Sequence, residues 1–377
     1  MSDSLEESHD PWLLTPGPLT TSKTVKEAML HDFGSRDARF ISINHHVRTR
    51  LVEIIDGKDS HVCVPLQGSG TFVVEAMLSN FVPESGKVLI LINGAYGVRM
   101  KTICDYHKRP VETLVWNEDQ PVDPRLVASK LSEDASITHV AVVHCETTTG
   151  ILNPIKDIAE VVKEAKRALL IDSMSAFGAL EVSAKLIPFD ALVASSNKCL
   201  EGSPGMGFCL ADKSALLKTE GNADSLCFDL FEQWKGLEAN GQWRFTPPTH
   251  CILAFHQALA EFDEEGGVQG RGGRYRANCD LLVKGMRELG FETLLPDNLQ
   301  APIIITFKMP SDSAFDFQTF YDGLSVRGYV IYPGKLTVAE SFRMGCIGRL
   351  NQQHMQGALD AVTEVMRQMG VDSGSPD

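Results

Sequence analysis

The 377-residue sequence has no apolar run approaching the roughly 20 residues that cross a bilayer. It also lacks an excess of positive charge, and its net charge of −14 disfavours binding to nucleic acids or acidic membranes. The first residues, MSDSLEESHDPW, are acidic and polar, unlike a signal or transit peptide. The nine cysteines are dispersed and form no CxxC pair, which favours reduced thiols. We therefore expect a cytoplasmic protein without nucleic-acid or membrane partners.

Apolar, strand-like runs alternate with helix-like segments through the first two thirds of the chain. Strands are predicted at 62–66, 88–92, 139–144, 168–171, 189–194 and 206–210, and helices at 71–81, 98–107, 124–131 and 154–166. Two further helices are predicted before them, one capped by Ser22 and one over 43–55. Continuously apolar strands alternating with helices are typical of an α/β fold with a mostly parallel sheet covered by helices on both faces.

The pattern changes after about residue 248. Helices are predicted over 249–265, up to residue 289, over 316–326 and over 352–369, and strands at 303–307, 329–332 and 341–345. The glycine- and arginine-rich residues 266–274 are interpreted as a solvated turn. These elements predict a small α+β domain at 271–377, after a large domain at 21–270 and an N-terminal arm at 1–20.

Lys198 follows the buried strand at 189–194 within the sequence SSNKCLEGSPG. Burial of an unpaired ammonium group costs several kcal/mol, so a lysine at this position needs a reason. A desolvated amine can capture a carbonyl as a Schiff base. The alternative is a solvated lysine in a loop.

The ends of the other predicted strands carry the groups that such a lysine would need. Ser69 and its glycine neighbours precede a helix and could surround a phosphate. Tyr96 follows the second strand, hydroxyls at 147–149 follow the third, and Asp172 follows the fourth. Because parallel strands place ligands at their carboxyl ends, these groups meet at one edge of the sheet. Together they predict a pyridoxal-phosphate site, although neither a Walker loop nor a G-x-G-x-x-G pattern is present.

Six segments, in order along the chain, resemble the class-V aminotransferases of fold type I: LTPGP at 14–18, GSGT at 68–71, NGAYG at 93–97, HCETTTG at 144–150, DSMS at 172–175 and SNKC at 196–199. That family includes alanine–glyoxylate and serine–pyruvate aminotransferases. The wording LLTPGPLTTSKTVKEAML, HCETTTGILNPI, SSNKCLEGSPG and RFTPPTH is most similar to members that act on 2-aminoethylphosphonate and pyruvate. The resemblance implies the fold-type-I transferase fold, pyridoxal 5′-phosphate as cofactor and a homodimer.

The resemblance also implies roles for individual residues around the cofactor. Lys198 resembles the Schiff-base lysine that moves the substrate proton, and Asp172 resembles the partner of the pyridine nitrogen. Tyr96 resembles the aromatic residue that stacks on the ring. The residues that correspond to the phosphate-binding set are Ser69, Gly70, Thr71 and Asn197.

Two threonines and three further residues complete the implied site. Thr148 corresponds to a contact with the ring hydroxyl or the phosphate edge, with Thr147 and Thr149 as adjacent alternatives. Thr246 corresponds to a residue that reaches the phosphate of the neighbouring subunit, which implies active sites shared across the dimer. The residues assigned to substrate are Arg343, Gly17 and Arg36.

The identity of the amino donor stays open at this point. The Arg343 guanidinium suits a carboxylate or a phosphonate equally well, so an alanine–glyoxylate or serine–pyruvate aminotransferase is the alternative. Arg36 either helps to hold a doubly charged phosphonate or forms an ordinary surface salt bridge. A desulfurase would need a reactive cysteine in a flexible loop, and a binding protein without activity would need neither Lys198 nor Asp172. No metal site is expected at the tandem His45 and His46, because no acidic cluster accompanies them.

Overall fold

The computed structural model describes residues 10–335 and 339–377. Residues 1–9 of the predicted arm therefore lie outside the described residues. None of the helices in the described ranges combines the length and the apolar sequence that a membrane crossing requires.

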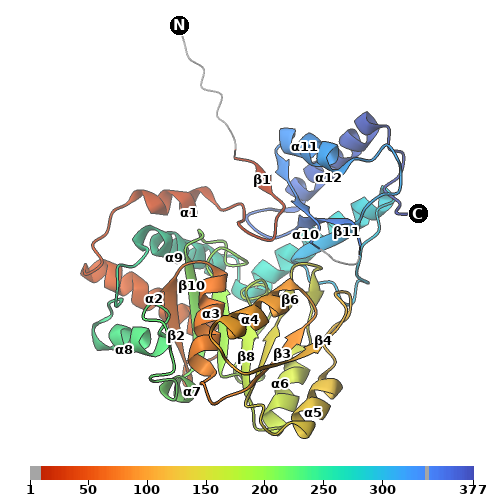
Figure 1. Ribbon diagram of the computed structural model, residues 1–377. Helices are drawn as coiled ribbons and strands as arrows, with labels where there is room; N and C mark the ends of the chain where they lie inside the picture. The colour runs from red at the N-terminus through yellow and green to blue at the C-terminus, as the bar shows by residue number, and fades with distance from the viewer. Residues whose placement is uncertain (1–9, 336–338) are drawn as a thin grey trace.

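A seven-stranded sheet lies at the centre of the larger part of the molecule (Figure 1). The strand order is β2-β10-β9-β8-β5-β3-β4, and β10 alone among these seven runs in the direction opposite to the others. The mostly parallel sheet predicted from the sequence is confirmed. The strands are β2 (His61–Gln67), β3 (Val88–Ile92), β4 (Val111–Val115), β5 (His139–Val143), β8 (Ala168–Asp172), β9 (Ala191–Ser195) and β10 (Met206–Asp212).

The edge strand β4 is a strand that the sequence patterns did not predict. Its residues are V-E-T-L-V, and none of them is fully buried, because β4 pairs with β3 on one side only. A half-exposed edge strand tolerates polar residues, so it lacks the continuous apolar run that marks the buried strands.

Helices cover both faces of this sheet, because alternate residues of each strand point to opposite sides. Leu89 and Leu91 belong to one apolar core, and Val88 and Ile90 belong to the other. The first core is closed by α2 (Ala38–Ile54), α5 (Pro124–Glu133), α6 (Ile155–Glu164) and α9 (Thr249–Glu264), and the second by α3 (Gly70–Phe81), α4 (Ala95–Tyr106) and α8 (Leu230–Asn240).

The C-terminal elements form a separate layer with its own apolar core (Figure 1). A three-stranded antiparallel sheet, ordered β11-β14-β13, packs with three helices, one of which is the C-terminal part of α10 (Gly267–Glu288). The N-terminal strand β1 pairs in parallel with β12, so the N-terminal segment packs against this C-terminal layer. The elements are β1 (Trp12–Leu13), β11 (Ile304–Lys308), α11 (Phe317–Val326), β12 (Tyr329–Val330), β13 (Tyr332–Pro333), β14 (Ser341–Gly345) and α12 (Gln352–Met369).

The remaining short elements connect these layers. Ser22 caps α1, as predicted, by accepting a hydrogen bond from the Val25 N–H. The elements are α1 (Lys23–Glu27), a 3₁₀ helix (Ala28–Leu30), β6 (Cys145–Glu146), β7 (Ile151–Leu152) and α7 (Lys213–Leu217).

The solvated turn predicted at 266–274 is wrong. Residues 267–288 form the continuous helix α10 (Gly267–Glu288), and Arg271 within it is fully buried. The glycines allow close packing rather than a turn, since a Cβ at Gly272 would lie 2.3 Å from the Ala179 carbonyl oxygen. The predicted domain boundary at residue 270 falls inside this helix.

Candidate active site

A cavity of about 490 Å³ opens at the carboxyl ends of the parallel strands. It is lined by residues from the N-terminal segment, from the turns after β2, β8 and β9, and from the start of α4. Eight of the predicted site residues meet there: Gly17, Ser69, Gly70, Thr71, Tyr96, Asp172, Asn197 and Lys198.

Lys198 lies on the turn after β9, where its side chain is largely buried. Burial lowers the pKa of its amine to about 8, and the positive charges of Arg343 and Arg99 act in the same direction. The Nζ atom donates a hydrogen bond to the Pro16 carbonyl oxygen. The lysine is therefore a buried amine that gives up its proton more readily than a solvated lysine.

Gly17 allows the N-terminal segment to approach this amine. Its φ is +120°, and a Cβ at this position would lie 2.6 Å from the Lys198 Nζ. Both the left-handed backbone and the lack of space exclude a side chain here.

Asp172 is the last residue of β8, and its side chain faces the cavity. Burial raises the pKa of its carboxyl group to about 6. One carboxylate oxygen accepts a hydrogen bond of 2.9 Å from the Met174 N–H. The carboxylate is thus a buried acceptor available to a cationic or N–H group in the cavity.

The turn before α3 has the form of an anion-binding site. Ser69 occupies the N-cap position without capping the helix through its side chain, so N–H groups of the first turn remain available. Gly70 packs closely against Met174, since a Cβ at this position would lie 2.5 Å from the Met174 sulfur. The hydroxyl of Thr71 accepts a hydrogen bond of 3.1 Å from Arg99.

Arg99 is a cavity residue that sequence reasoning missed. It lies in the first turns of α4, and its guanidinium carbon is 4.9 Å from the centroid of the Tyr96 ring. The i, i+3 spacing between Tyr96 and Arg99 puts both side chains on one face of a helix. That spacing alone does not distinguish a cavity-facing arginine from a surface one.

Thr148 does not reach the cavity. Its hydroxyl donates a 3.2 Å hydrogen bond to Glu146, whose other carboxylate oxygen accepts the N–H groups of Tyr96 and Gly97 at 3.0 Å each. Burial raises the pKa of Glu146 to about 7. Glu146 and Thr148 therefore anchor the start of α4, which carries Tyr96 and Arg99.

Arg343 is buried at the centre of β14 and lies close enough to Lys198 to influence its pKa. Its Nη1 donates to the Thr147 carbonyl oxygen at 2.8 Å, and its Nε and Nη2 both donate to Pro333 at 3.1 Å. A guanidinium group has five N–H donors, and two of them have no partner among residues 10–335 and 339–377, which leaves them for an anionic substrate.

Arg36 and Thr246 lie outside the cavity of their own chain. Arg36 is exposed just before α2 and forms no ion pair with any residue in the described ranges, so the surface salt bridge is not seen. Thr246 is exposed next to Phe245, whose side chain is 50% exposed.

The sequence was compared with protein families and with curated proteins. Residues 21–328 match the model of the family Aminotransferase class-V. The chain belongs to the class-V aminotransferases. It is 52% identical to a 2-aminoethylphosphonate–pyruvate transaminase of Cupriavidus taiwanensis over 97% of each chain. It is 53% identical to an enzyme of the same name from Pseudomonas putida, over 97% of this chain and 99% of the relative.

Solved structures resemble this class-V aminotransferase in fold. The ureidoglycine–glyoxylate aminotransferase of Bacillus subtilis superimposes with a TM-score of 0.88 at 22% identity, covering 97% of this chain and 95% of that one. The pyridoxamine–pyruvate aminotransferase of Mesorhizobium loti gives a TM-score of 0.86 at 23% identity, covering 97% and 94%. The fold-type-I architecture predicted from the sequence is confirmed.

Two cysteines close to the lysine of this class-V aminotransferase are unsuited to desulfurase chemistry. Cys145 lines the cavity and Cys199 follows Lys198, and both are buried. Burial raises the pKa of the Cys199 thiol to about 12 and that of Cys145 further still. Because a thiolate is the nucleophile in sulfur transfer, these protonated thiols argue against that alternative.

Proposed function

We propose that this chain transfers the amino group of 2-aminoethylphosphonate to pyruvate, giving phosphonoacetaldehyde and L-alanine, with pyridoxal 5′-phosphate as cofactor. The observation that carries the proposal is identity of 52–53%, over nearly the whole chain, to enzymes named for that reaction. The cavity supports it independently, since it gathers a lysine, an aspartate, an aromatic ring and a helix N-terminus.

The residues around the cavity fit the cofactor. The available N–H groups at the start of α3 suit its phosphate, together with the Ser69 and Thr71 hydroxyls and Asn197. Asp172 is a buried acceptor that suits the protonated pyridine nitrogen, and Tyr96 offers an aromatic face. Pyridoxal phosphate, when bound, supplies an aldehyde that takes up the donor's amino group and a ring that withdraws electrons from the donor carbon.

The residues of this chain then have distinct tasks. Lys198 would move the proton between the donor carbon and the C4′ carbon of the cofactor, and burial lowers the pKa of its amine to about 8, which favours the unprotonated form that accepts a proton. Asp172 keeps the ring nitrogen protonated. Arg343 binds the phosphonate of the donor and the carboxylate of pyruvate with its two remaining N–H groups. One site therefore serves both substrates in alternation.

We also propose a homodimer with shared active sites. Thr246 is exposed, and the nearby surface carries large apolar side chains, with Phe72 46% exposed, Phe245 50% and Leu226 68%. Arg244 donates a hydrogen bond to the Leu226 carbonyl oxygen, and Phe72 contacts Phe228, so these segments adjoin each other and the phosphate turn. A second copy would cover this surface and bring its own Thr246 to the phosphate.

The free cysteines support a cytoplasmic location. All nine are unpaired, a state that a reducing compartment maintains.

The decisive experiment follows the visible absorbance of the pyridoxal phosphate-loaded protein after mixing with one amino donor and no keto acid. We expect rapid bleaching with 2-aminoethylphosphonate and recovery on addition of pyruvate. Bleaching with L-serine alone would instead identify a serine–pyruvate aminotransferase. No visible band after loading would overturn the cofactor assignment.

A variant tests the role of Arg343 in the same assay. Arg343→Met removes the two N–H groups that we assign to the anion, which we expect to lower kcat/KM for 2-aminoethylphosphonate about a hundredfold or more. The exposed Arg349→Met is the matched control, for which we expect little change.

A further inference from the structure

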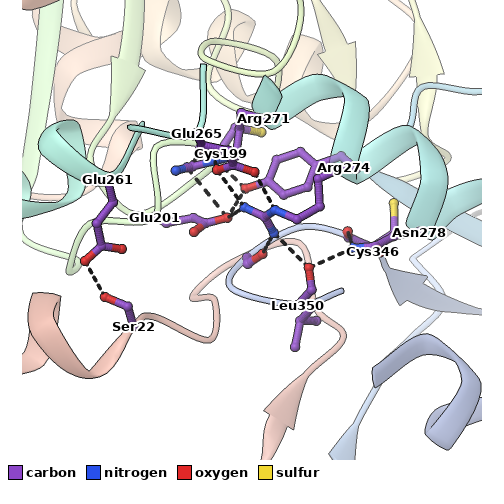
Figure 2. Close-up of polar contacts among 12 residues, drawn as sticks. Ser22, Cys199, Glu201, Glu261, Glu265, Arg271, Arg274, Asn278, Cys346 and Leu350 are labelled. Atoms are coloured by element: carbon purple, nitrogen blue, oxygen red, sulfur yellow. Dashed lines mark hydrogen bonds and ion pairs between the residues drawn. The ribbon is translucent and has the colours of Figure 1, made fainter. Parts of the chain in front are cut away.

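A buried polar cluster surrounds Cys199 and Glu201, the first and third residues after Lys198 (Figure 2). We call it the arginine–glutamate cluster, and it consists of Glu201, Glu265, Arg271, Arg274 and Tyr275. Arg271 and Tyr275 are fully buried and Glu201 nearly so. The two arginines balance the two glutamates, so the cluster carries no net charge.

The cluster holds the lysine turn at two points. Arg271 Nη1 donates a 2.8 Å hydrogen bond to the carbonyl oxygen of Cys199, and the Tyr275 hydroxyl lies 3.2 Å from the same atom. That hydroxyl also donates to the Glu201 carboxylate, which accepts a further hydrogen bond of 2.7 Å from Arg274. The residues held in this way are the first and the third after Lys198.

The conformation of the turn requires such support. Glu201 has a φ of +59°, a left-handed conformation that non-glycine residues avoid. In this conformation its N–H donates a 2.8 Å hydrogen bond to the carbonyl oxygen of Lys198. The bonds to the Glu201 carboxylate therefore stabilise the backbone on which the lysine side chain begins.

Helix α10, which carries Arg271, Arg274 and Tyr275, also binds the segment after β14, the strand that carries Arg343. Arg274 Nη1 donates to the carbonyl oxygens of Gly348 and Leu350, and Asn278 donates to those of Cys346 and Leu350 at 3.1 and 3.0 Å. Helix α10 thus contacts both Cys199, the residue after the lysine, and the segment that begins at Cys346, three residues after Arg343 (Figure 2).

Stability alone does not account for this arrangement. Replacement of a buried ionic cluster by well-packed apolar residues is often neutral or stabilising. Here Arg271 and Tyr275 meet the backbone of the turn after Lys198, and Arg271 lies 72 residues from Cys199 in sequence. A cluster that fixes the direction of a side chain explains this choice of residues better than one that adds free energy of folding.

We propose that Arg271 and Tyr275 are positioning residues for Lys198: by holding the Cys199 carbonyl and the Glu201 carboxylate, they fix the turn that directs the lysine amine into the cavity. The inference rests on the proposed function, because it assigns the purpose of the turn to amino transfer. Neither residue lines the cavity.

The first test is Tyr275→Phe in the full-length, pyridoxal phosphate-loaded protein. The ring remains, Arg271 still binds Cys199 and Arg274 still binds Glu201, so the variant should fold. Because small displacements of a reacting group lower rates steeply, we expect kcat to fall about tenfold while KM for 2-aminoethylphosphonate changes less than about twofold. Tyr321→Phe on α11 is the matched control and should retain the wild-type kcat.

A second readout does not depend on activity. In the apoprotein of Tyr275→Phe, hydrogen exchange at the Glu201 and Gly202 amides should accelerate about tenfold, since both donate to carbonyls of this turn. Arg271→Lys should behave in the same way, because a lysine cannot replace the guanidinium fork, whereas Arg287→Lys on the exposed face of α10 should not.

The outcomes separate the two proposals. A wild-type protein that forms no visible band with pyridoxal phosphate contradicts the proposed function. If the wild type is active and Tyr275→Phe matches Tyr321→Phe in both kcat and amide exchange, the positioning role is refuted. A rise in KM at unchanged kcat would also refute it, because it would place the effect on substrate binding.

Discussion

The burial of Asp172 predicts that this residue destabilises the apoprotein at neutral pH. Its pKa rises from 3.8 to about 6 because the carboxyl group is buried. Between these two values the native state binds a proton that the unfolded state has lost, so the free energy of unfolding falls as the pH rises through this range. Above pH 6 both states are ionised, and the full cost remains.

The magnitude follows from the shift of about two pKa units, each worth about 1.4 kcal/mol, which gives about 3 kcal/mol as an upper estimate. Asp172→Asn keeps an oxygen that can accept the Met174 N–H but removes the charge. We therefore expect the apoprotein variant to unfold with a free energy about 2–3 kcal/mol higher than wild type at pH 7.5. The difference should shrink toward zero near pH 4.

The assay is urea unfolding of both apoproteins between pH 4 and 8 at one fixed protomer concentration, since association would add its own dependence. The exposed Asp157→Asn serves as the control and should change the free energy by less than about 0.5 kcal/mol. Pyridoxal phosphate should bind the Asp172→Asn protein about ten- to a hundredfold more weakly, because a hydrogen bond to a charged group is lost. An apoprotein variant no more stable than wild type at pH 7.5 would refute the argument from burial.

Two further predictions concern the approach of other segments to the lysine. Gly17→Ala adds a methyl group 2.6 Å from the Lys198 Nζ, so the donor half-reaction should slow at least about tenfold. The control is Gly221→Ala, because Gly221 has a φ of +79° and open space around it. This variant should lose stability and keep the wild-type rate of the half-reaction. Equal rates in stopped-flow absorbance would contradict the steric argument. Thr246→Ala should weaken cofactor binding about tenfold, measured by equilibrium dialysis. In a mixed dimer of Thr246→Ala with Lys198→Met, one site combines the intact Lys198 of the first copy with the intact Thr246 of the second. That site should bind the cofactor with wild-type affinity, and its absence would exclude shared sites.

Much of the site could be predicted from the sequence, because it lies at the ends of buried strands. Asp172 and Lys198 each follow a continuous apolar run, and such runs mark parallel strands whose carboxyl ends share one edge. The position of Ser69 at the site could be predicted in the same way, since it lies between a strand and a helix. Order along the chain was enough to place these groups together.

Side-chain direction was not available from that order. Thr148 is the middle one of three consecutive threonines. Only the tertiary structure shows that its hydroxyl points to Glu146 and away from the cavity. Arg99 follows Tyr96 by one helical turn, but its inward direction depends on the packing of α4 beside α3.

Residues 266–274 show most clearly what the sequence alone determined and what it did not. Five glycines and two arginines within nine residues carry the local signals of a solvated turn. The structure makes a helix of them, because Gly272 can approach the Ala179 carbonyl and Arg271 finds its partners in Glu265 and the Cys199 carbonyl. Here contacts between residues distant in sequence outweigh the local conformational preference. The apolar runs of the sequence therefore determined the sheet and the groups at the strand ends. Tertiary packing decided which polar side chains contact the turn that carries the lysine.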